Sequence, residues 1–142
     1  MIEELVTLRE LNRDTDMNFI IQSWLKSLRV ASPFYRSIPK QMFYEAHKRS
    51  ILETMDQLEC SCLVASPANE PNIIVGYLVY EERSPVYAVL HYTYVKLNFR
   101  EMGLANLMIN KVAADRKLIA THYTRKIKNL SFNPYMFKME RL

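Results

Sequence analysis

The segment Arg100-Glu101-Met102-Gly103-Leu104-Ala105 carries an arginine, a glycine and a small residue at a spacing that suits the binding of phosphate groups. Gly103 lets the backbone approach a ligand closely or adopt a positive φ angle, and Ala105 leaves room where a larger side chain would clash. Arg100 adds a delocalised cation that pairs well with phosphate oxygens. These residue types therefore predict a site for a pyrophosphate group.

Two elements must position this segment. The β-branched and aromatic run Val86–Val95 predicts a strand before it, and the spacing of apolar residues from Leu104 predicts a helix after it. The first N–H groups of a helix have no partner within the helix, and its N-terminal end carries partial positive charge. A strand that leads into a helix through such a loop therefore aims N–H groups at one spot, where a pyrophosphate can accept hydrogen bonds.

The stretch Tyr94–Ile109 resembles the acyl-coenzyme A loop of the GCN5-related N-acetyltransferase (GNAT) superfamily. The pattern of that family is Arg/Gln-x-x-Gly-x-Gly/Ala after a strand that ends in valine. Arg100, Gly103 and Ala105 match it, and Val95 stands five residues before the arginine, as it does in the family. The predicted order of elements upstream is also similar, so the resemblance covers residues 1 to about 125. It implies an α/β (α+β) fold, with helices flanking a mixed, mostly antiparallel sheet and a shortened C-terminal part, and acetyl-CoA as the acyl donor.

The resemblance also implies which residues bind the cofactor. The backbone of Thr93 and Val95 would hydrogen-bond the pantetheine arm, in a gap where the fourth and fifth strands part. Backbone groups from Arg100 to Ala105 would hold the pyrophosphate, and Asn106 would begin the helix nearby. The predicted cofactor-binding residues are Thr93, Val95, Arg100, Glu101, Met102, Gly103, Leu104, Ala105 and Asn106.

Acetylation of an amine needs a base for the amine proton, a donor that polarises the thioester carbonyl and an acid for the leaving thiolate. We predict His91 as the base, because imidazole titrates near neutral pH, and Tyr135 as the acid, because the family commonly places a tyrosine there. Strand alternation predicts that Tyr92 and Tyr94 face the side opposite His91. The other candidates for acid and base roles are Glu81, Glu82, His122 and Tyr123.

The predicted order of elements is a strand, two helices, three strands in an antiparallel meander, the motif helix and a fifth strand, in a single domain over residues 1–142. Trp24 is predicted to anchor the core, and His47 to be exposed. The ranges are a strand at 4–10, a helix capped by Asp14 or Thr15, a break at Ser32-Pro33, a helix beginning near Pro39, strands Cys60–Ala65, Ile73–Glu81 and Val86–Val95, a helix from Leu104 to about Arg116, and a strand Leu118–Thr124.

The charge balance is mildly basic, with 19 Lys and Arg against 15 Asp and Glu and a net charge of +4. The densest basic cluster lies late in the chain. It is either a solvated surface or a patch for nucleic acid, an acidic protein or a phosphorylated cofactor. Nothing else in the sequence favours nucleic acid, which we therefore do not expect as the partner. The cluster consists of Arg116, Lys117, Arg125, Lys126 and Lys128.

Cysteine usage and hydropathy limit the other classes of function. Cys60 and Cys62 are the only cysteines and lack the spacing of a zinc site, so we expect neither a metal site nor a disulfide framework. This usage predicts a reducing, cytoplasmic location. The longest apolar run, Ile73–Tyr80, is far shorter than the about 20 residues that span a bilayer, so we expect no membrane partner.

The tail after Thr124 departs from the family, because about eighteen residues remain where a helix and two strands normally follow. A homodimer or another partner chain completes the acceptor site, or that site is open, or the fold is used without catalysis. The leading hypothesis is an acetyl-CoA-dependent N-acetyltransferase that acts on a primary amine of a protein or small molecule. The alternative is a non-catalytic interaction or assembly protein, such as a viral one, with a degenerate site. Its aromatic anchors would be Phe34, Tyr35, Phe132, Tyr135 and Phe137.

Overall fold

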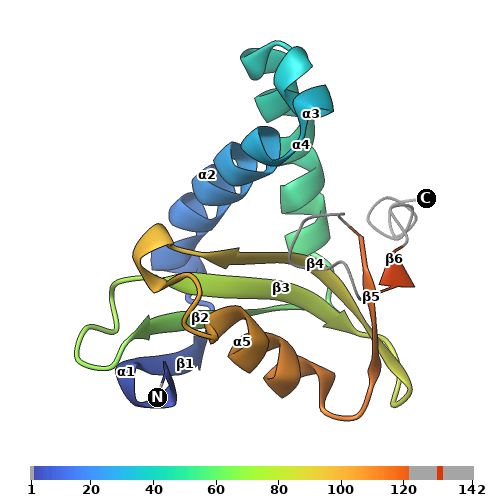
Figure 1. The fold of residues 1–142 in the computed structure, drawn as a ribbon. Coiled ribbons are helices and arrows are strands. Elements are labelled where there is room, and N and C mark those ends of the chain that lie inside the picture. Colours follow the sequence, from blue (N-terminus) through green and yellow to red (C-terminus); the bar gives the residue numbers. More distant parts are fainter. Residues whose placement is uncertain (1, 122–130, 133–142) are drawn as a thin grey trace.

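The computed structural model describes residues 2–121 and the backbone of 131–132. Its strands form one six-stranded sheet in chain order, β1-β2-β3-β4-β5-β6 (Figure 1). The first four strands pair antiparallel, whereas β5 is parallel to β4 and β6 is parallel to β5. The predicted mixed, mostly antiparallel sheet is therefore confirmed. The strands are β1 Val6–Glu10, β2 Cys60–Pro67, β3 Gly76–Glu82, β4 Tyr87–Val95, β5 Lys117–Ala120 and β6 Ser131–Phe132.

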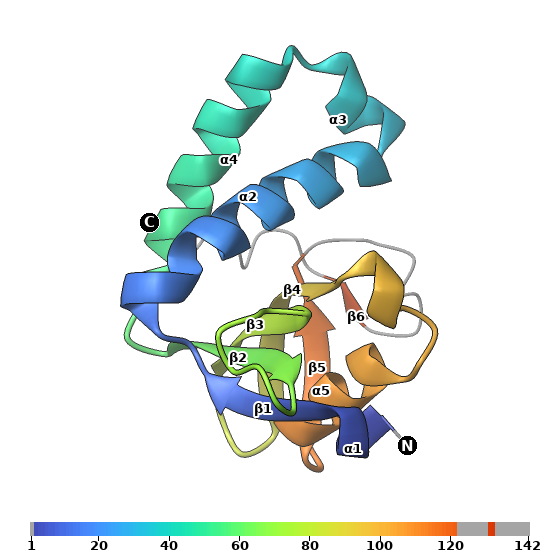
Figure 2. The same cartoon turned by 90° about the vertical axis from the view of Figure 1, so that its left-hand side faces the viewer.

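Helices cover both faces of this sheet. Figures 1 and 2 show α2 and α4 rising together on one side, while α5 lies against the other side. The predicted break at Ser32-Pro33 is confirmed, since α2 ends at Ala31, and a short helix then begins at Pro33 because proline suits the first turn of a helix. The helices are α1 Ile2–Leu5, α2 Arg13–Ala31, α3 Pro33–Ser37, α4 Lys40–Met55, the 3₁₀ turn η1 Leu97–Phe99 and α5 Leu104–Ala113. In the described part of the chain, no helix combines the length and the apolar character needed to cross a membrane.

Several predicted boundaries are wrong by a few residues. The strand predicted at 4–10 begins at Val6, since a helical turn precedes it, and the strand predicted from Ile73 begins at Gly76. The motif helix ends at Ala113, because Ala114 takes a positive φ of 42° that no regular helix contains. The fifth strand ends at Ala120, and residues 122–124 lie outside the described part.

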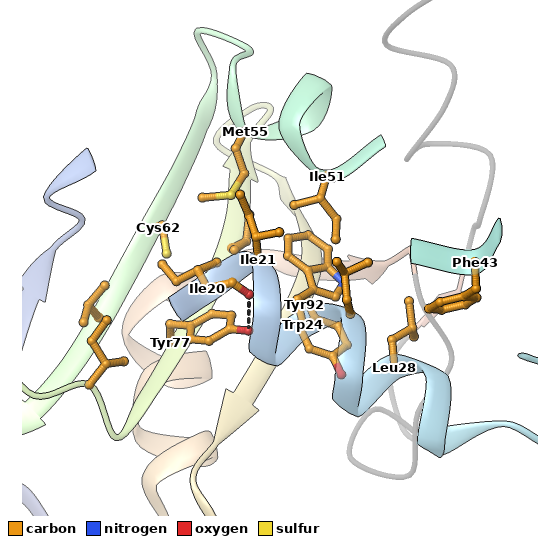
Figure 3. Packing of buried hydrophobic residues seen from close by; sticks show 14 residues of the cluster. Ile20, Ile21, Trp24, Leu28, Phe43, Ile51, Met55, Cys62, Tyr77 and Tyr92 are labelled. Carbon is orange, nitrogen blue, oxygen red and sulfur yellow. Dashed lines mark hydrogen bonds between the residues drawn. The ribbon is translucent and has the colours of Figure 1, made fainter. Parts of the chain in front are cut away.

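The core between the sheet and α2 is built on aromatic rings (Figure 3). Trp24 is fully buried, as predicted, and its ring stacks on that of Tyr92 with centroids 5.0 Å apart. The Tyr77 hydroxyl donates a hydrogen bond of 3.1 Å to the backbone carbonyl of Ile20. The hydroxyls of Tyr92 and Ser27 lie 2.6 Å apart. Each buried ring thus has a hydrogen-bonded or stacked partner on α2, which fixes the helix over β3 and β4.

The opposite face is closed by α5, which packs Leu104, Met108 and Val112 against the sheet. Gly76 makes this approach feasible. A Cβ atom there would lie 2.9 Å from the carbonyl oxygen of Tyr94 and 3.1 Å from a methyl carbon of Leu104. No larger residue fits without moving backbone, so Gly76 sets how closely the start of α5 approaches the end of β4.

A buried carboxylate ties β1 to the start of α2. Asp16 receives two hydrogen bonds from Arg9, of 2.7 and 3.1 Å, and one of 2.8 Å from the N–H of Asn12. Burial alone would raise the pKa of Asp16, but these hydrogen bonds and the charge of Arg9 outweigh it, so the pKa lies below its ordinary value.

We expect Asp16→Asn to lower the free energy of unfolding by about 2 kcal/mol at pH 7, because an amide cannot accept all these bonds from a cation. The lowered pKa means that this stability is present above the unfolded pKa near 4 and is lost as pH falls through the folded value. Urea unfolding should therefore show a large difference in the free energy of unfolding between wild type and variant at pH 7, and a smaller difference at pH 3. Asp14→Asn, at an exposed position of the same helical turn, is the control and should cost less than about 1 kcal/mol.

Candidate functional site

The predicted phosphate loop is a strand–turn–helix unit in the structure. β4 ends at Val95, η1 follows, and Gly103 is the N-cap of α5 with a positive φ of 90°. The first bond within the helix runs from the N–H of Leu107 to the carbonyl of Gly103, at 2.9 Å. The N–H groups of the three residues before Leu107 therefore have no acceptor within the helix. Gly103 offers no side-chain cap, and the first turn holds no acidic residue.

A cavity of about 360 Å³ lies at this end of α5. It brings together most of the residues predicted to bind the cofactor. Thr93 and Met102 are not among its lining residues, and Met102 instead lines a separate hollow beside Ile2. The predicted set does not include Phe99 and Ile109. The spacing of four residues between Ala105 and Ile109 could have indicated Ile109, because it places these two residues on one face of the helix. The cavity is lined by Val95, Phe99, Arg100, Glu101, Gly103, Leu104, Ala105, Asn106 and Ile109.

Arg100 fastens the loop to the end of the strand. Its Nε donates a hydrogen bond of 2.8 Å to the backbone carbonyl of Val95. The opposite edge of the β4 backbone faces β3. There the N–H of Lys96 donates a hydrogen bond of 2.8 Å to the carbonyl of Val75. Because successive residues of a strand point their N–H and C=O groups to opposite edges, Thr93 and Val95 direct theirs away from β3.

The fourth and fifth strands pair over half of β4 only. The register joins Tyr87 to Lys117 and ends with Leu90 opposite Ala120, followed by one bond of 3.0 Å from the N–H of Thr121 to the Leu90 carbonyl. Along 91–95, β4 has no strand partner on this edge among the described residues. This is the edge to which the backbone of Thr93 and Val95 is directed.

A β-bulge marks the point where the two strands part. Val79 pairs with Tyr92 and Tyr80 with Leu90, so His91 is an extra residue in β4. The prediction that Tyr92 faces away from His91 is wrong, because a bulge interrupts the alternation of the strand. Tyr92 stacks on Trp24 of α2, and His91 contacts Glu81, which lies two residues from Val79 on the same face. Tyr94 packs with Tyr77 on that face too, with ring centroids 5.2 Å apart.

His91 belongs to a buried polar chain across three strands. Arg83 Nε lies 2.8 Å from one carboxylate oxygen of Glu81, and His91 Nε2 lies 3.2 Å from the other. The Nδ1 atom of His91 is 3.1 Å from the hydroxyl of Thr121. Burial alone would raise the pKa of Glu81, but the hydrogen bonds and charges of His91 and Arg83 outweigh it, so the pKa lies below its ordinary value. Both ring nitrogens of His91 thus face protein groups, at the place where β4 and β5 separate.

The remaining candidates are spread over the molecule. Glu82 pairs at the surface with Arg116, 2.7 Å apart, so that member of the basic cluster is already neutralised. His47 is half-buried rather than exposed as predicted, because its ring stacks on Phe43 with centroids 4.1 Å apart. Among the residues that the structure describes, no group of three or more His, Cys, Asp or Glu is placed to hold a metal ion. Predicted residues outside the described part are His122, Tyr123, Tyr135, Arg125, Lys126 and Lys128.

Solved structures of acetyltransferases share this fold. The chain matches a provisionally assigned acetyl transferase from Pyrococcus furiosus, with 16% identity, 95% of this chain and 89% of that chain covered, and a TM-score of 0.66. It also matches a provisionally assigned GNAT family acetyltransferase from Staphylococcus aureus, with 14% identity, 75% of this chain and 88% of that chain covered, and a TM-score of 0.55. A third match is the PaiA N-acetyltransferase of Thermoplasma acidophilum in complex with coenzyme A, with 15% identity, 78% of this chain and 70% of that chain covered, and a TM-score of 0.52. No family model and no curated protein matches the sequence.

Proposed function

On the GNAT acetyltransferase fold that this chain has, we propose that it is an acetyl-CoA-dependent N-acetyltransferase that moves an acetyl group to a primary amine. One observation carries the proposal: the cavity at the N-terminus of α5 opens beside the edge of β4 that lacks a described strand partner. A helix terminus and an extended edge side by side suit a ligand with a pyrophosphate and an amide-bearing arm.

The residues present fit coenzyme A. The N–H groups of Leu104, Ala105 and Asn106 have no acceptor within α5, and the first turn of α5 holds no acidic residue, so the one carboxylate that lines the cavity among the described residues is that of Glu101, in the loop before the helix. Arg100 lies at the same cavity. The backbone of Thr93 and the N–H of Val95 are directed to the edge where a pantetheine arm would lie. The Val95 carbonyl already accepts a bond from Arg100, so this chain offers the arm fewer acceptors than the sequence suggests.

When bound, acetyl-CoA supplies a thioester carbonyl as the acyl donor and a thiolate as the leaving group. The new N–C bond forms as the C–S bond breaks, the amine gives up a proton and the thiolate takes one. Backbone N–H groups on the open edge of β4 would polarise the carbonyl. We assign His91 the base role, with Glu81 orienting its ring at Nε2, which leaves Nδ1, 3.1 Å from the Thr121 hydroxyl, as the nitrogen to take the proton. Tyr135 stays the predicted acid.

The melting temperature with excess acetyl-CoA tests the proposal. At one hundred times its dissociation constant, a ligand stabilises by about 2.7 kcal/mol, which is a shift of roughly 5–10 °C for a chain of this size. NAD⁺, which has a pyrophosphate but no pantetheine arm, is the control and should shift the melting temperature by less than about 2 °C. Thiol release over a panel of primary amines then measures transfer. No shift with acetyl-CoA would overturn the cofactor assignment, and a shift without thiol release would indicate binding without turnover.

One observation favours the alternative, a non-catalytic interaction protein. The outer end of the α2–α3–α4 hairpin projects from the sheet (Figures 1 and 2) and exposes Val30, Phe34 and Met42, the second at 69%. Isolated exposed apolar residues are common, but three at one projecting end suit an interface. Tyr35, predicted as an anchor, instead packs on Phe43 with ring centroids 5.3 Å apart. The side chains of Phe132, Tyr135 and Phe137 lie outside the described part.

A further inference from the structure

A second, larger cavity of about 550 Å³ lies on the opposite face of the sheet from α5. One wall is the face of α2 that runs from Phe19 to Ala31. Tyr44 of α4, Tyr94 at the end of β4, and Leu97 and Arg100 of the loop complete it. We call it the α2 groove. Its volume lies within the range of sites that enclose small molecules.

The walls of the α2 groove are mostly aromatic and apolar. The rings of Phe19 and Tyr94 meet edge to face with centroids 6.0 Å apart. The hydroxyls of Ser23 and Ser27 point at buried tyrosines, at 2.8 Å from Tyr77 and 2.6 Å from Tyr92, and so already have partners. Such walls suit a flat apolar body rather than a polar chain.

The charge of the α2 groove has one sign. Of the residues that the structure describes, only Lys26 and Arg100 bring charge to the lining, and neither forms an ion pair with another described residue. A polycationic acceptor would meet two like charges and no carboxylate from the described lining. A ligand that carries a carboxylate would instead neutralise Lys26, so the electrostatics favour an anionic group on the occupant.

The α2 groove and the proposed cofactor cavity meet at Arg100, which lines both. Tyr94, which lines the groove, is two residues from Tyr92 in β4, a span of about 7 Å along a strand. A molecule in the groove therefore lies close to the bulge at His91 and to the open edge of β4.

We propose that the α2 groove binds the acceptor, and that the acceptor is a small primary amine with an aromatic body and a carboxylate, of the kind an aromatic amino acid has. The inference rests on the proposed acetyl transfer. Lys26 pairs with the carboxylate, while Phe19, Tyr44 and Tyr94 contact the ring.

Binding of a product analogue tests the groove without turnover. We expect calorimetry to show that N-acetyl-L-phenylalanine binds and that Lys26→Glu weakens it about tenfold, because a favourable charge contact becomes a repulsive one. N-acetyl-L-phenylalaninamide lacks the charge and should change less than about twofold. Lys111→Glu carries the same charge change on α5, outside every cavity described above, and should leave both affinities unchanged.

Turnover gives a second readout. We expect kcat/KM of the wild type to favour phenylalanine over phenylalaninamide and over spermidine, and Lys26→Glu to lower the ratio of phenylalanine to phenylalaninamide about tenfold. Comparing that ratio between wild type and variant cancels the different basicity of the two amines. A wild type that prefers spermidine, or a ratio that Lys26→Glu leaves unchanged, would overturn the assignment.

Coenzyme affinity separates a failure of the acceptor assignment from a failure of the proposed acetyl transfer. If Lys26→Glu weakens acetyl-CoA more than about threefold in the thermal assay while Lys111→Glu does not, the groove holds part of the coenzyme and the acceptor assignment fails. If acetyl-CoA shifts no melting temperature at all, the proposed function fails, even where N-acetyl-L-phenylalanine still binds.

Discussion

Ala105→Glu will abolish most of the stabilisation that acetyl-CoA gives, if the pyrophosphate binds at the start of α5. Ala105 lines the cavity at the second helical position, so a carboxylate there would stand against the phosphates. Two like charges about 4 Å apart repel by roughly 4 kcal/mol at an intermediate dielectric. Allowing for solvent, we expect about 3 kcal/mol, which weakens binding roughly a hundredfold and leaves about 1 °C of the thermal shift.

The same substitution should not harm the fold. An acidic residue in the first turn of a helix is favourable, and Ala105 has ordinary helical geometry, unlike Gly103 with its positive φ of 90°. Ala105→Gln separates bulk from charge and should lose clearly less affinity than Ala105→Glu. Asn110→Glu adds the same charge on an exposed position of α5 outside this cavity, and should keep the full shift. A normal coenzyme shift in Ala105→Glu would show that the pyrophosphate is elsewhere.

The strand–loop–helix unit could be predicted because its signals are local. The β-branched run up to Val95 is typical of a strand, the apolar period from Leu104 is typical of a helix, and Gly103 marks the turn between them. These signals depend on neighbours in the sequence, and the structure has both elements near the predicted bounds. The antiparallel meander of β2, β3 and β4 is predicted from the same local signals, since consecutive strands usually pair.

The bulge and the α2 groove could not be predicted, because both depend on pairing between distant segments. The sequence around His91 gives no sign that His91 lacks a pairing partner in β3. This β-bulge turns the side chains of His91 and Tyr92 to one face of the sheet. Likewise, Lys26 and Tyr94 come together only once α2 crosses the sheet. The sequence predicts Thr121 only as one residue of a strand Leu118–Thr124, and its contact with His91 depends on how β4 and β5 pair. The sequence therefore predicts the proposed cofactor site but not the groove that we assign to the acceptor.

Glu81→Gln will lower the free energy of unfolding by about 3 kcal/mol at pH 7. The carboxylate of Glu81 is 1% exposed and lies between Arg83, at 2.8 Å, and His91, at 3.2 Å. An amide cannot neutralise Arg83 and is a weaker acceptor than a carboxylate for His91, and loss of one member of a buried ion pair typically costs about 3–5 kcal/mol. We expect a cost at the low end of this range because Arg83 is partly exposed and can turn to solvent. Urea unfolding measures the difference.

Glu82→Gln is the matched control, one residue away. Glu82 pairs with Arg116 at the surface, where its side chain is 50% exposed, and pairs of this kind contribute about 1 kcal/mol or less. We therefore expect Glu82→Gln to cost less than about 1 kcal/mol. If the two variants cost the same, the polar chain does not hold β3, β4 and the end of β5 together, and Glu81 could not orient His91 as we propose.

The pH dependence of the Glu81→Gln effect has a defined sign. Because the pKa of Glu81 is lowered in the folded state, the unfolded chain takes up its proton first as the pH falls below about 4.5. The stabilising contribution is therefore present at neutral pH and is lost through the folded pKa in more acidic solution. The difference in the free energy of unfolding between wild type and Glu81→Gln should therefore narrow between pH 5 and pH 3. A gap that widens in acid would mean that Glu81 is protonated in the native state, and His91 would then lack the carboxylate that its proposed role as a base requires.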